Sequence, residues 1–285
     1  VGWTGCAGGP VRGFEHAEFF LSMRGACFAI ISAPLLCVAG WAKPLIVAHR
    51  GSSFDRPENT LPAFELAWEQ GADAIEGDFL LTKDKQIVCI HDHSTKRLAN
   101  RNLVVGESTL EELRELDVGS HKDLSWKGTK IPTISEVFAT IPDKKKIFIE
   151  VKCGMEIIPY LVKEIGKSNL KPEQIILICF DQEVIKAFKQ VLPQNKAYWL
   201  SGFKKDKAGD WRPTLDKVLM TLKDTNADGL DSSKNVPSEI ARKVMRAGYE
   251  WHAWTVNDVT TAKNLKALGI RSITTDRPEL IKGSL

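Results

Sequence analysis

The feature that most limits the fold of this chain is an alternation of short apolar runs with helical patterns, which continues from residue 45 to the end. Several of the runs are apolar throughout, as strands buried on both faces of a sheet are. Strands that alternate with helices form a parallel sheet with crossover connections, so the pattern predicts an α/β fold. The predicted strands are residues 45–50, 74–79, 87–91, 147–152, 175–180, 197–200, 228–231, 249–256 and 271–276.

Helical patterns lie in the intervals between these strands. The clearest are TLPAFELAWEQG (60–71), VIKAFKQVL (184–192), SEIARKVMRAG (238–248) and VTTAKNLKALG (259–269). Gly71, Gly248 and Gly269 are the last residues of three of these patterns. A glycine at this place is typical of a helix end, because it adopts the left-handed backbone that closes the last turn.

The number of elements predicts a distorted (β/α)8 TIM barrel. Residues 43–285 have about the ~250-residue length of such a barrel, but they contain nine strand patterns for eight places. The turn at 83–85 is too short for a parallel crossover, so we expect 74–82 and 87–92 to form an antiparallel hairpin with one arm partly outside the barrel. Residues 93–146, with the helical pattern TLEELREL (109–116), are expected to form a small insertion after the second or third strand.

The first 42 residues have a different character. Met23 and the arginine that follows it precede a stretch of about fifteen mostly apolar residues, 26–40, which is typical of a secretory signal peptide. The stretch is shorter than the ~20 residues of a membrane span, and Pro34 interrupts it. We therefore expect residues 1–42 to be absent from the mature protein. The residues before Met23 are interpreted as sequence upstream of the true translation start. Residues 43–285 would then form a single periplasmic or secreted domain. The alternatives for the apolar stretch are a buried hydrophobic arm and an uncleaved anchor, and the alternative location is the cytoplasm.

Charge and cysteine content exclude several classes of function. The formal charge is +3 and the pI about 8.4, too mild a surplus to attract nucleic acid. Beyond residue 42 the cysteines are Cys89, Cys153 and Cys179, without Cys-x-x-Cys spacing. No disulfide framework and no cysteine zinc site is predicted, although two of the three can pair in an oxidising compartment.

Polar residues gather where the predicted strands end. In a parallel barrel the carboxyl ends of the strands carry the chemistry, because the interior is otherwise packed with apolar side chains. Residues two apart on a strand face the same way, so we expect the pairs Glu76/Asp78 and Glu150/Lys152 each to share a face. The residues at the predicted ends are His49, Arg50, Glu76, Asp78, His91, Asp92, Glu150, Lys152 and Trp254.

The three carboxylates at these ends predict a metal site. Glu76, Asp78 and Glu150 would repel one another unless a positive group lay among them, and oxygen ligands suit Ca²⁺ or Mg²⁺ better than zinc. Taken alone, Glu-x-Asp on a strand is more typical of an exposed edge, and Glu150 can form an ion pair with Lys152. Their joint placement favours the metal site. The remaining histidines are interpreted as surface or packing residues: His93, His121 and His252.

Four segments together resemble one known family. They are HRGSSFDRPENT at 49–60, EGDFLLTKDKQIVCIHD at 76–92, EVK at 150–152 and WTVN at 254–257. They resemble the motifs of the glycerophosphodiester phosphodiesterase family, in the same order, from about residue 45 to 280. The resemblance implies a distorted (β/α)8 barrel with two histidines and a divalent metal held by three acidic residues.

The same resemblance implies roles for individual residues. Carried over by position, they are a catalytic pair, a metal-binding triad and a phosphate-binding pair: His49 and His91; Glu76, Asp78 and Glu150; Arg50 and Lys152. We expect Phe180 and Trp254 to line the substrate site, with packing at the barrel rim as the alternative. Residues 181–248 contain little motif, so the sequence does not indicate which alcohol is preferred.

The expected activity is hydrolysis of glycerophosphodiesters to sn-glycerol 3-phosphate and an alcohol, with one divalent cation, Mg²⁺ or Ca²⁺. Cleavage of a phosphodiester requires charge neutralisation and in-line positioning. Histidines, which titrate near neutral pH, suit the two proton transfers. The sequence leaves open which histidine is the acid. It also leaves open whether water or a glycerol hydroxyl attacks first, the latter through a cyclic phosphate.

Two other functions stay open at this stage. One is a lipid-directed phosphodiesterase, either a lyase resembling phospholipase C or a lysophospholipase D. The other is a protein that binds glycerophosphodiesters without cleaving them, although a carrier needs no proton-transfer pair. The expected partner is a small-molecule substrate, with no nucleic acid and no stable membrane span in residues 43–285; the oligomeric state stays open.

Overall fold

The structure, a computed structural model, describes residue 2 and residues 43–285. The predicted signal peptide and the residues interpreted as lying upstream of it fall outside the described residues. Within the described part, no helix combines the length and the apolar content needed to cross a membrane. Cys89, Cys153 and Cys179 are all free thiols.

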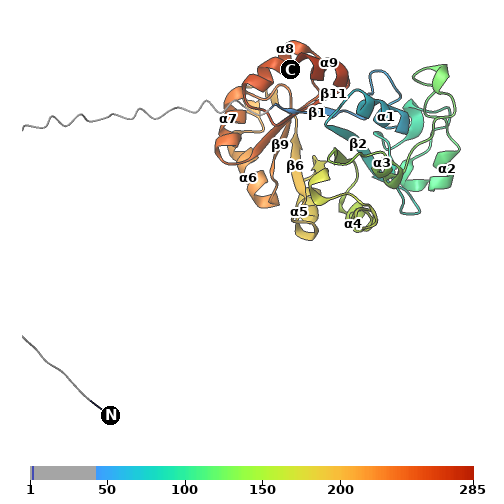
Figure 1. Ribbon diagram of the computed structural model, residues 1–285, viewed down its shortest axis with the longest axis horizontal. Coiled ribbons are helices and arrows are strands. Elements are labelled where there is room, and N and C mark those ends of the chain that lie inside the picture. The colour runs from blue at the N-terminus through green and yellow to red at the C-terminus, as the bar shows by residue number, and fades with distance from the viewer. Residues whose placement is uncertain (1, 3–42) are drawn as a thin grey trace, which may run out of the picture. The chain divides into compact units, whose positions relative to one another are not determined.

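Eight parallel strands of residues 43–285 close into a barrel, as predicted (Figure 1). Around the barrel their order is β1, β11, β10, β9, β6, β5, β4 and β2, and pairing of Val47 on β1 with Ala74 on β2 closes the ring. The strands are β1 (Leu45–Ala48), β2 (Ala74–Leu81), β4 (Lys146–Val151), β5 (Ile175–Cys179), β6 (Lys196–Ser201), β9 (Gly229–Ser233), β10 (Glu250–Trp254) and β11 (Ser272–Thr275).

Helices cover the outside of the barrel, and Figure 1 shows α5 to α9 arranged around the strands. They are α1 (Leu61–Glu69), α3 (Ile134–Ala139), α4 (Ile158–Lys167), α5 (Gln182–Val191), α6 (Leu215–Thr225), α7 (Ser238–Arg246), α8 (Val259–Ala267) and α9 (Pro278–Ser284). The four clearest helical patterns of the sequence correspond to α1, α5, α7 and α8. Gly71, Gly248 and Gly269 follow three of these helices with φ of 78°, 92° and 90°, as predicted.

Side chains on the strands alternate between two cores. Phe148 on β4 lies with Val47 among residues contributed by strands, inside the barrel. Its neighbours Ile147 and Ile149 belong to the larger core that includes the helices. The alternation continues to the end of the strand, so Glu150, two residues after Phe148, also faces the barrel interior. On β4 an apolar inward residue near the start of the strand is thus followed by a polar one at the carboxyl mouth.

The predicted hairpin is present. β3 (Ile87–Cys89) pairs antiparallel with β2, with Cys89 beside Phe79, and lies outside the ring of parallel strands. The turn that joins β2 and β3 contains Lys85 in a left-handed conformation with φ of 62°. This hairpin accounts for the ninth strand pattern of the sequence.

The insertion after β3 is shorter than predicted. It spans about residues 93–133, because α3, which had been assigned to it, packs in the barrel core instead. The insertion contains short 3-10 helices at Thr95–Arg97, Val105–Glu107 and Leu124–Trp126 and the helix α2 (Leu110–Arg114). With β2 and β3 it encloses a small core of its own: Leu80, Val88, Ile90, Leu98, Val105, Leu113, Leu116, Val118 and Ile131.

One further element was not expected from the sequence. β7 (Lys204–Lys205) and β8 (Trp211–Arg212) form a two-stranded antiparallel sheet after β6. Both lysines are exposed, and Lys205 lies over the ring of Trp211 at 5.6 Å from its centre. These two lysines are therefore solvated residues of a short strand.

Candidate functional site

The residues predicted at the strand ends meet at the carboxyl mouth of the barrel. A cavity of about 190 Å³ is located there. Among its lining residues are His49, Arg50, Glu76, His91, Glu150, Lys152, Phe180 and Trp254. Two predicted residues are not part of this lining: Asp78 is completely buried beside the cavity, and Asp92 is partly exposed and contacts His91.

Glu76, Asp78 and Glu150, here called the acidic triad, each direct one carboxylate oxygen to a common point. These oxygens lie within 4.8 Å of one another. Burial, followed by the charges of the other two members, raises the pKa of Glu76 well above its usual range. Burial and then Asp78 also raise the pKa of Glu150. Glu76 Oε1 and Asp78 Oδ1 have no hydrogen-bond partner among residues 43–285. Crowded oxygens with free lone pairs fit a hard divalent cation.

Two cationic side chains border the acidic triad. Arg50 Nε lies 3.1 Å from Asp78 Oδ2, and Lys152 Nζ lies 2.8 Å from Glu150 Oε1 and 3.6 Å from Asp78 Oδ1. Burial by itself would lower the pKa of Lys152, but the two carboxylates raise it above its usual value. Both side chains therefore stay charged and present positive groups to the cavity, which suits an anionic ligand.

His49 follows β1 and is held by Asp276, which follows β11. His49 Nδ1 lies 2.6 Å from Asp276 Oδ1, and Asn257 Nδ2 and Ser53 Oγ donate to the same carboxylate at 2.6 and 3.0 Å. Burial would raise the pKa of Asp276, but the bond from His49 and the other donors lower it to about 2. An ionised Asp276 accepts the Nδ1 proton. In the neutral form of the ring, His49 Nε2, which lies 4.0 Å from Glu76 Oε2, is then the nitrogen without a proton.

His91 has the same kind of support on the other side of the site. Its Nδ1 lies 2.6 Å from Asp92 Oδ1, and its Nε2 lies 3.3 Å from Lys152 Nζ. Asp92 also accepts a bond of 2.8 Å from Arg97 Nε. Burial would raise the pKa of Asp92, and the bonds from His91 and Arg97 lower it below its usual value. Each imidazole thus has an ionised aspartate on Nδ1.

The loop between β1 and α1 holds the site together from behind. Glu58 accepts bonds from Arg50 at 3.1 Å and from Arg97 at 2.7 and 2.9 Å. Asn59, in a left-handed conformation with φ of 58°, donates to Asp78 Oδ2 at 2.8 Å and accepts from the Asp78 N–H at 3.1 Å. The Pro-Glu-Asn-Thr segment therefore fixes one cation and one member of the acidic triad.

Another part of the cavity wall consists mainly of apolar side chains. Phe180, 49% exposed, meets Trp254 edge to face at 5.6 Å between ring centres. Ile178 and Leu200 line the cavity below them, together with the carboxyl of Asp231. A ligand in this cavity would place an anionic group near the cations and a carbon chain near these residues.

Sequence reasoning missed several residues of the site. The sequence places Asp92 at a strand end but indicates no role for it. Glu58 and Asn59 belong to a motif of the family that the chain resembles, and no individual role was predicted for either. Asp276 and Asp231 are the last residues of predicted strands, and this position was a usable signal for both. The other histidines of residues 43–285 are not part of the site: His93 and His121 are exposed, and His252 is buried in the barrel, stacked on Tyr198.

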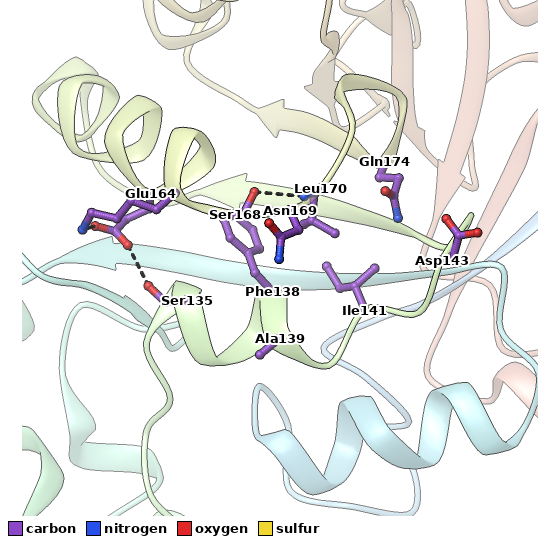
Figure 2. A pocket seen from close by; sticks show the side chains of 11 residues that line it. Ser135, Phe138, Ala139, Ile141, Asp143, Glu164, Ser168, Asn169, Leu170 and Gln174 are labelled. Carbon is purple, nitrogen blue, oxygen red and sulfur yellow. Dashed lines mark hydrogen bonds and ion pairs between the residues drawn. The ribbon is translucent and has the colours of Figure 1, made fainter.

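A larger hollow, of about 600 Å³, lies between α3 and α4 (Figure 2). Figure 2 shows Ser135 of α3 facing Glu164 of α4, with a hydrogen bond of 2.7 Å between them. Among its lining residues, all within the described part, are exposed carboxylates such as Asp143 but no imidazole and no thiol. The residues for which the sequence predicts a catalytic role therefore line the cavity at the barrel mouth and not this hollow.

Comparison with known proteins agrees with this geometry. The family model described as the glycerophosphoryl diester phosphodiesterase family matches residues 49–280. A glycerophosphodiester phosphodiesterase of Caldanaerobacter subterraneus subsp. tengcongensis is 33% identical over 244 residues, which are 84% of this chain and 96% of the relative. One from Bacillus subtilis is 29% identical over 253 residues, 83% of this chain and 84% of the relative.

Solved structures give the same result. A phosphodiesterase from Oleispira antarctica, in complex with the product sn-glycerol-3-phosphate, has a TM-score of 0.76 and 25% identity. The match covers 85% of this chain and 96% of that one. A glycerophosphodiester phosphodiesterase from Thermotoga maritima has a TM-score of 0.68 and 26% identity, and the match covers 85% and 98%.

Proposed function

Because this chain belongs to the glycerophosphoryl diester phosphodiesterase family, we propose that it hydrolyses glycerophosphodiesters to sn-glycerol 3-phosphate and an alcohol, with Mg²⁺ or Ca²⁺ as cofactor. The observation that supports this most is the convergence, on one cavity, of the acidic triad and two imidazoles that each carry an aspartate on Nδ1. The Oleispira antarctica structure, which holds sn-glycerol-3-phosphate, supports the same substrate class.

Charge neutralisation is the first requirement of the reaction. A phosphodiester is anionic and repels a nucleophile, so groups that bind its oxygens lower the barrier. Arg50 offers a planar pair of donors and Lys152 a point charge, and both line the cavity. A divalent cation held by the acidic triad would supply Lewis-acid polarisation of a phosphate oxygen. The matched charges of the chain thus fit a phosphate group at the centre of the cavity.

Proton transfer is the second requirement. With Nδ1–H bonded to Asp276, His49 presents an unprotonated Nε2 that can accept the proton of the attacking hydroxyl. His91 is bonded to Asp92 through Nδ1, and its imidazolium form can give the Nε2 proton to the leaving alkoxide and so become neutral. The two histidines take opposite roles, and either assignment is compatible with the arrangement. A protein that only binds its ligand has no use for such a pair.

The test is to incubate the purified protein with glycerophosphocholine and to measure released sn-glycerol 3-phosphate. We expect release with Mg²⁺ or Ca²⁺, loss in the presence of chelator, and recovery when the metal is restored. Release of phosphocholine in place of choline would mean that the other ester bond is cut. An accumulating cyclic phosphate would indicate a lyase, and binding without turnover a carrier. Full activity after metal removal would refute the metal-dependent proposal.

A further inference from the structure

One buried carboxyl in the cavity takes no part in the proposed chemistry. Asp231 is the third residue of β9, paired in register with Leu200 on β6 and His252 on β10. It is 0% exposed, yet it lines the cavity. Neither of its side-chain oxygens has a hydrogen-bond partner among the described residues.

Such a group is costly to keep in a barrel interior. A carboxyl that is buried without a partner loses its hydrogen bonds with water and gains none from protein. Burial and the charge of Glu150 raise the pKa of Asp231 well above its usual range, which reflects the absence of a compensating cation within residues 43–285. The adjacent lining residues Ile178 and Leu200 are apolar, so a leucine at position 231 would extend a uniform apolar wall.

The proposed catalytic groups do not account for Asp231. It is not a member of the acidic triad, whose oxygens lie within 4.8 Å of one another. Its hydrogen bond to the rim is made by its backbone carbonyl, which accepts from Trp254 Nε1 at 3.2 Å. That bond holds the aromatic rim above the side chain, and the two carboxyl oxygens stay available to a ligand.

We propose that Asp231 is a specificity-determining residue whose carboxyl accepts a hydrogen bond from a hydroxyl of the substrate's glyceryl group. The inference rests on the proposed function. Phe180, half-exposed at the rim, marks the open end of the cavity, and Asp231 lies at its closed end. The alcohol varies between glycerophosphodiesters and needs the open end, whereas the glyceryl group is common to all of them. Ile178 and Leu200 would contact its carbon atoms.

The test compares two ligands that differ only in hydroxyl groups. Binding of sn-glycerol 3-phosphate and of n-propyl phosphate is measured by calorimetry at saturating Mg²⁺, with inorganic phosphate as control ligand. A hydrogen bond to a buried group is worth roughly a 10-fold to 100-fold preference for glycerol 3-phosphate in the unsubstituted protein. In Asp231→Leu and Asp231→Ala we expect this preference to fall to about twofold or less, with propyl phosphate and inorganic phosphate bound as before. Asp231→Asn keeps an acceptor oxygen and should retain part of the preference.

Stability provides an independent measurement. Because the unpartnered carboxyl destabilises the fold, Asp231→Leu should unfold at the same temperature as the unsubstituted protein or higher. If the leucine variant does not fold, the alanine variant gives the binding result. An undiminished preference for glycerol 3-phosphate in the variants would overturn the assignment. So would an equal loss for all three ligands, which would indicate a role in the metal or phosphate site. Failure of the unsubstituted protein to bind glycerol 3-phosphate would overturn the proposed function as well.

Discussion

Replacing Asp276 by asparagine tests how His49 is held. The substitution keeps the shape of the side chain but removes the charge that accepts the Nδ1 proton at 2.6 Å. In the unsubstituted protein Asn257 Nδ2 donates to the other carboxylate oxygen of Asp276. The asparagine has a single side-chain oxygen, which can accept the hydrogen bond from His49 or the one from Asn257, but not both. One of these bonds therefore fails, and His49 is free to move its proton to Nε2, the nitrogen that faces the cavity.

The size of the effect can be worked from the site. General acid–base groups contribute about 10² to 10⁴ in rate, so we expect kcat to fall by at least about 10²-fold. The lowering of the Asp276 pKa from 3.8 to about 2 corresponds to about 2 kcal/mol, which we reduce to about 1 kcal/mol because the side chain is 29% exposed. A lowered pKa stabilises the fold above the unfolded pKa of 3.8. This contribution is lost as the pH falls through about 2.

The assay is hydrolysis of glycerophosphocholine at saturating metal, with kcat and KM determined separately, and urea unfolding at about pH 7 and about pH 3. We expect KM to change by less than about threefold, because substrate binding groups are intact. Asp143→Asn, in the exposed hollow of Figure 2, is the control and should match the unsubstituted protein. A kcat within about threefold of normal for Asp276→Asn, or an equal change for the control, would refute the argument.

Three further substitutions test other parts of the site. His91→Ala should reduce kcat by about 10²-fold or more with an unchanged circular dichroism spectrum; near-normal turnover would exclude a catalytic role. Glu150→Gln should weaken Mg²⁺ binding, measured by equilibrium dialysis, by about tenfold or more, and unchanged binding would remove Glu150 from the metal site. Gly51→Ala should lower the free energy of unfolding by more than about 1 kcal/mol, because Gly51 has a φ of +80° and the added Cβ would lie 2.6 Å from the Ala63 backbone. Urea unfolding measures this loss, and a smaller one would show that the turn relaxes.

Local patterns in the sequence were sufficient for much of the site. Because side chains two residues apart on a strand face the same way, the spacing alone placed Glu76 with Asp78. The three-residue turn at 83–85 was enough to predict the hairpin and its antiparallel sense. These inferences depend only on residues that are close in the sequence, so they can be made without knowledge of the whole fold.

The contacts that were missed depend on closure of the barrel. Asp276 reaches His49 because β11 lies beside β1, although 227 residues separate the two side chains. No local pattern indicates which strand ends become neighbours across such a distance. The burial of Asp231 could not be predicted from the sequence either, since a single acidic residue at a strand end is also compatible with an exposed position at the barrel rim. The boundary of the insertion was wrong because α3 is short and is identified by its packing rather than its pattern.

The catalytic role proposed for His91 makes turnover depend on a layer of the molecule that has its own core. This residue follows β3, outside the ring of parallel strands, whereas His49 follows β1 in the ring. The layer that carries His91 has a separate core of nine buried residues, and a segment with fewer buried apolar contacts opens at a lower free energy than the main body of a protein. On warming, the enzyme should therefore lose its hydrolytic activity while its barrel is still folded. The activity should return at once on cooling.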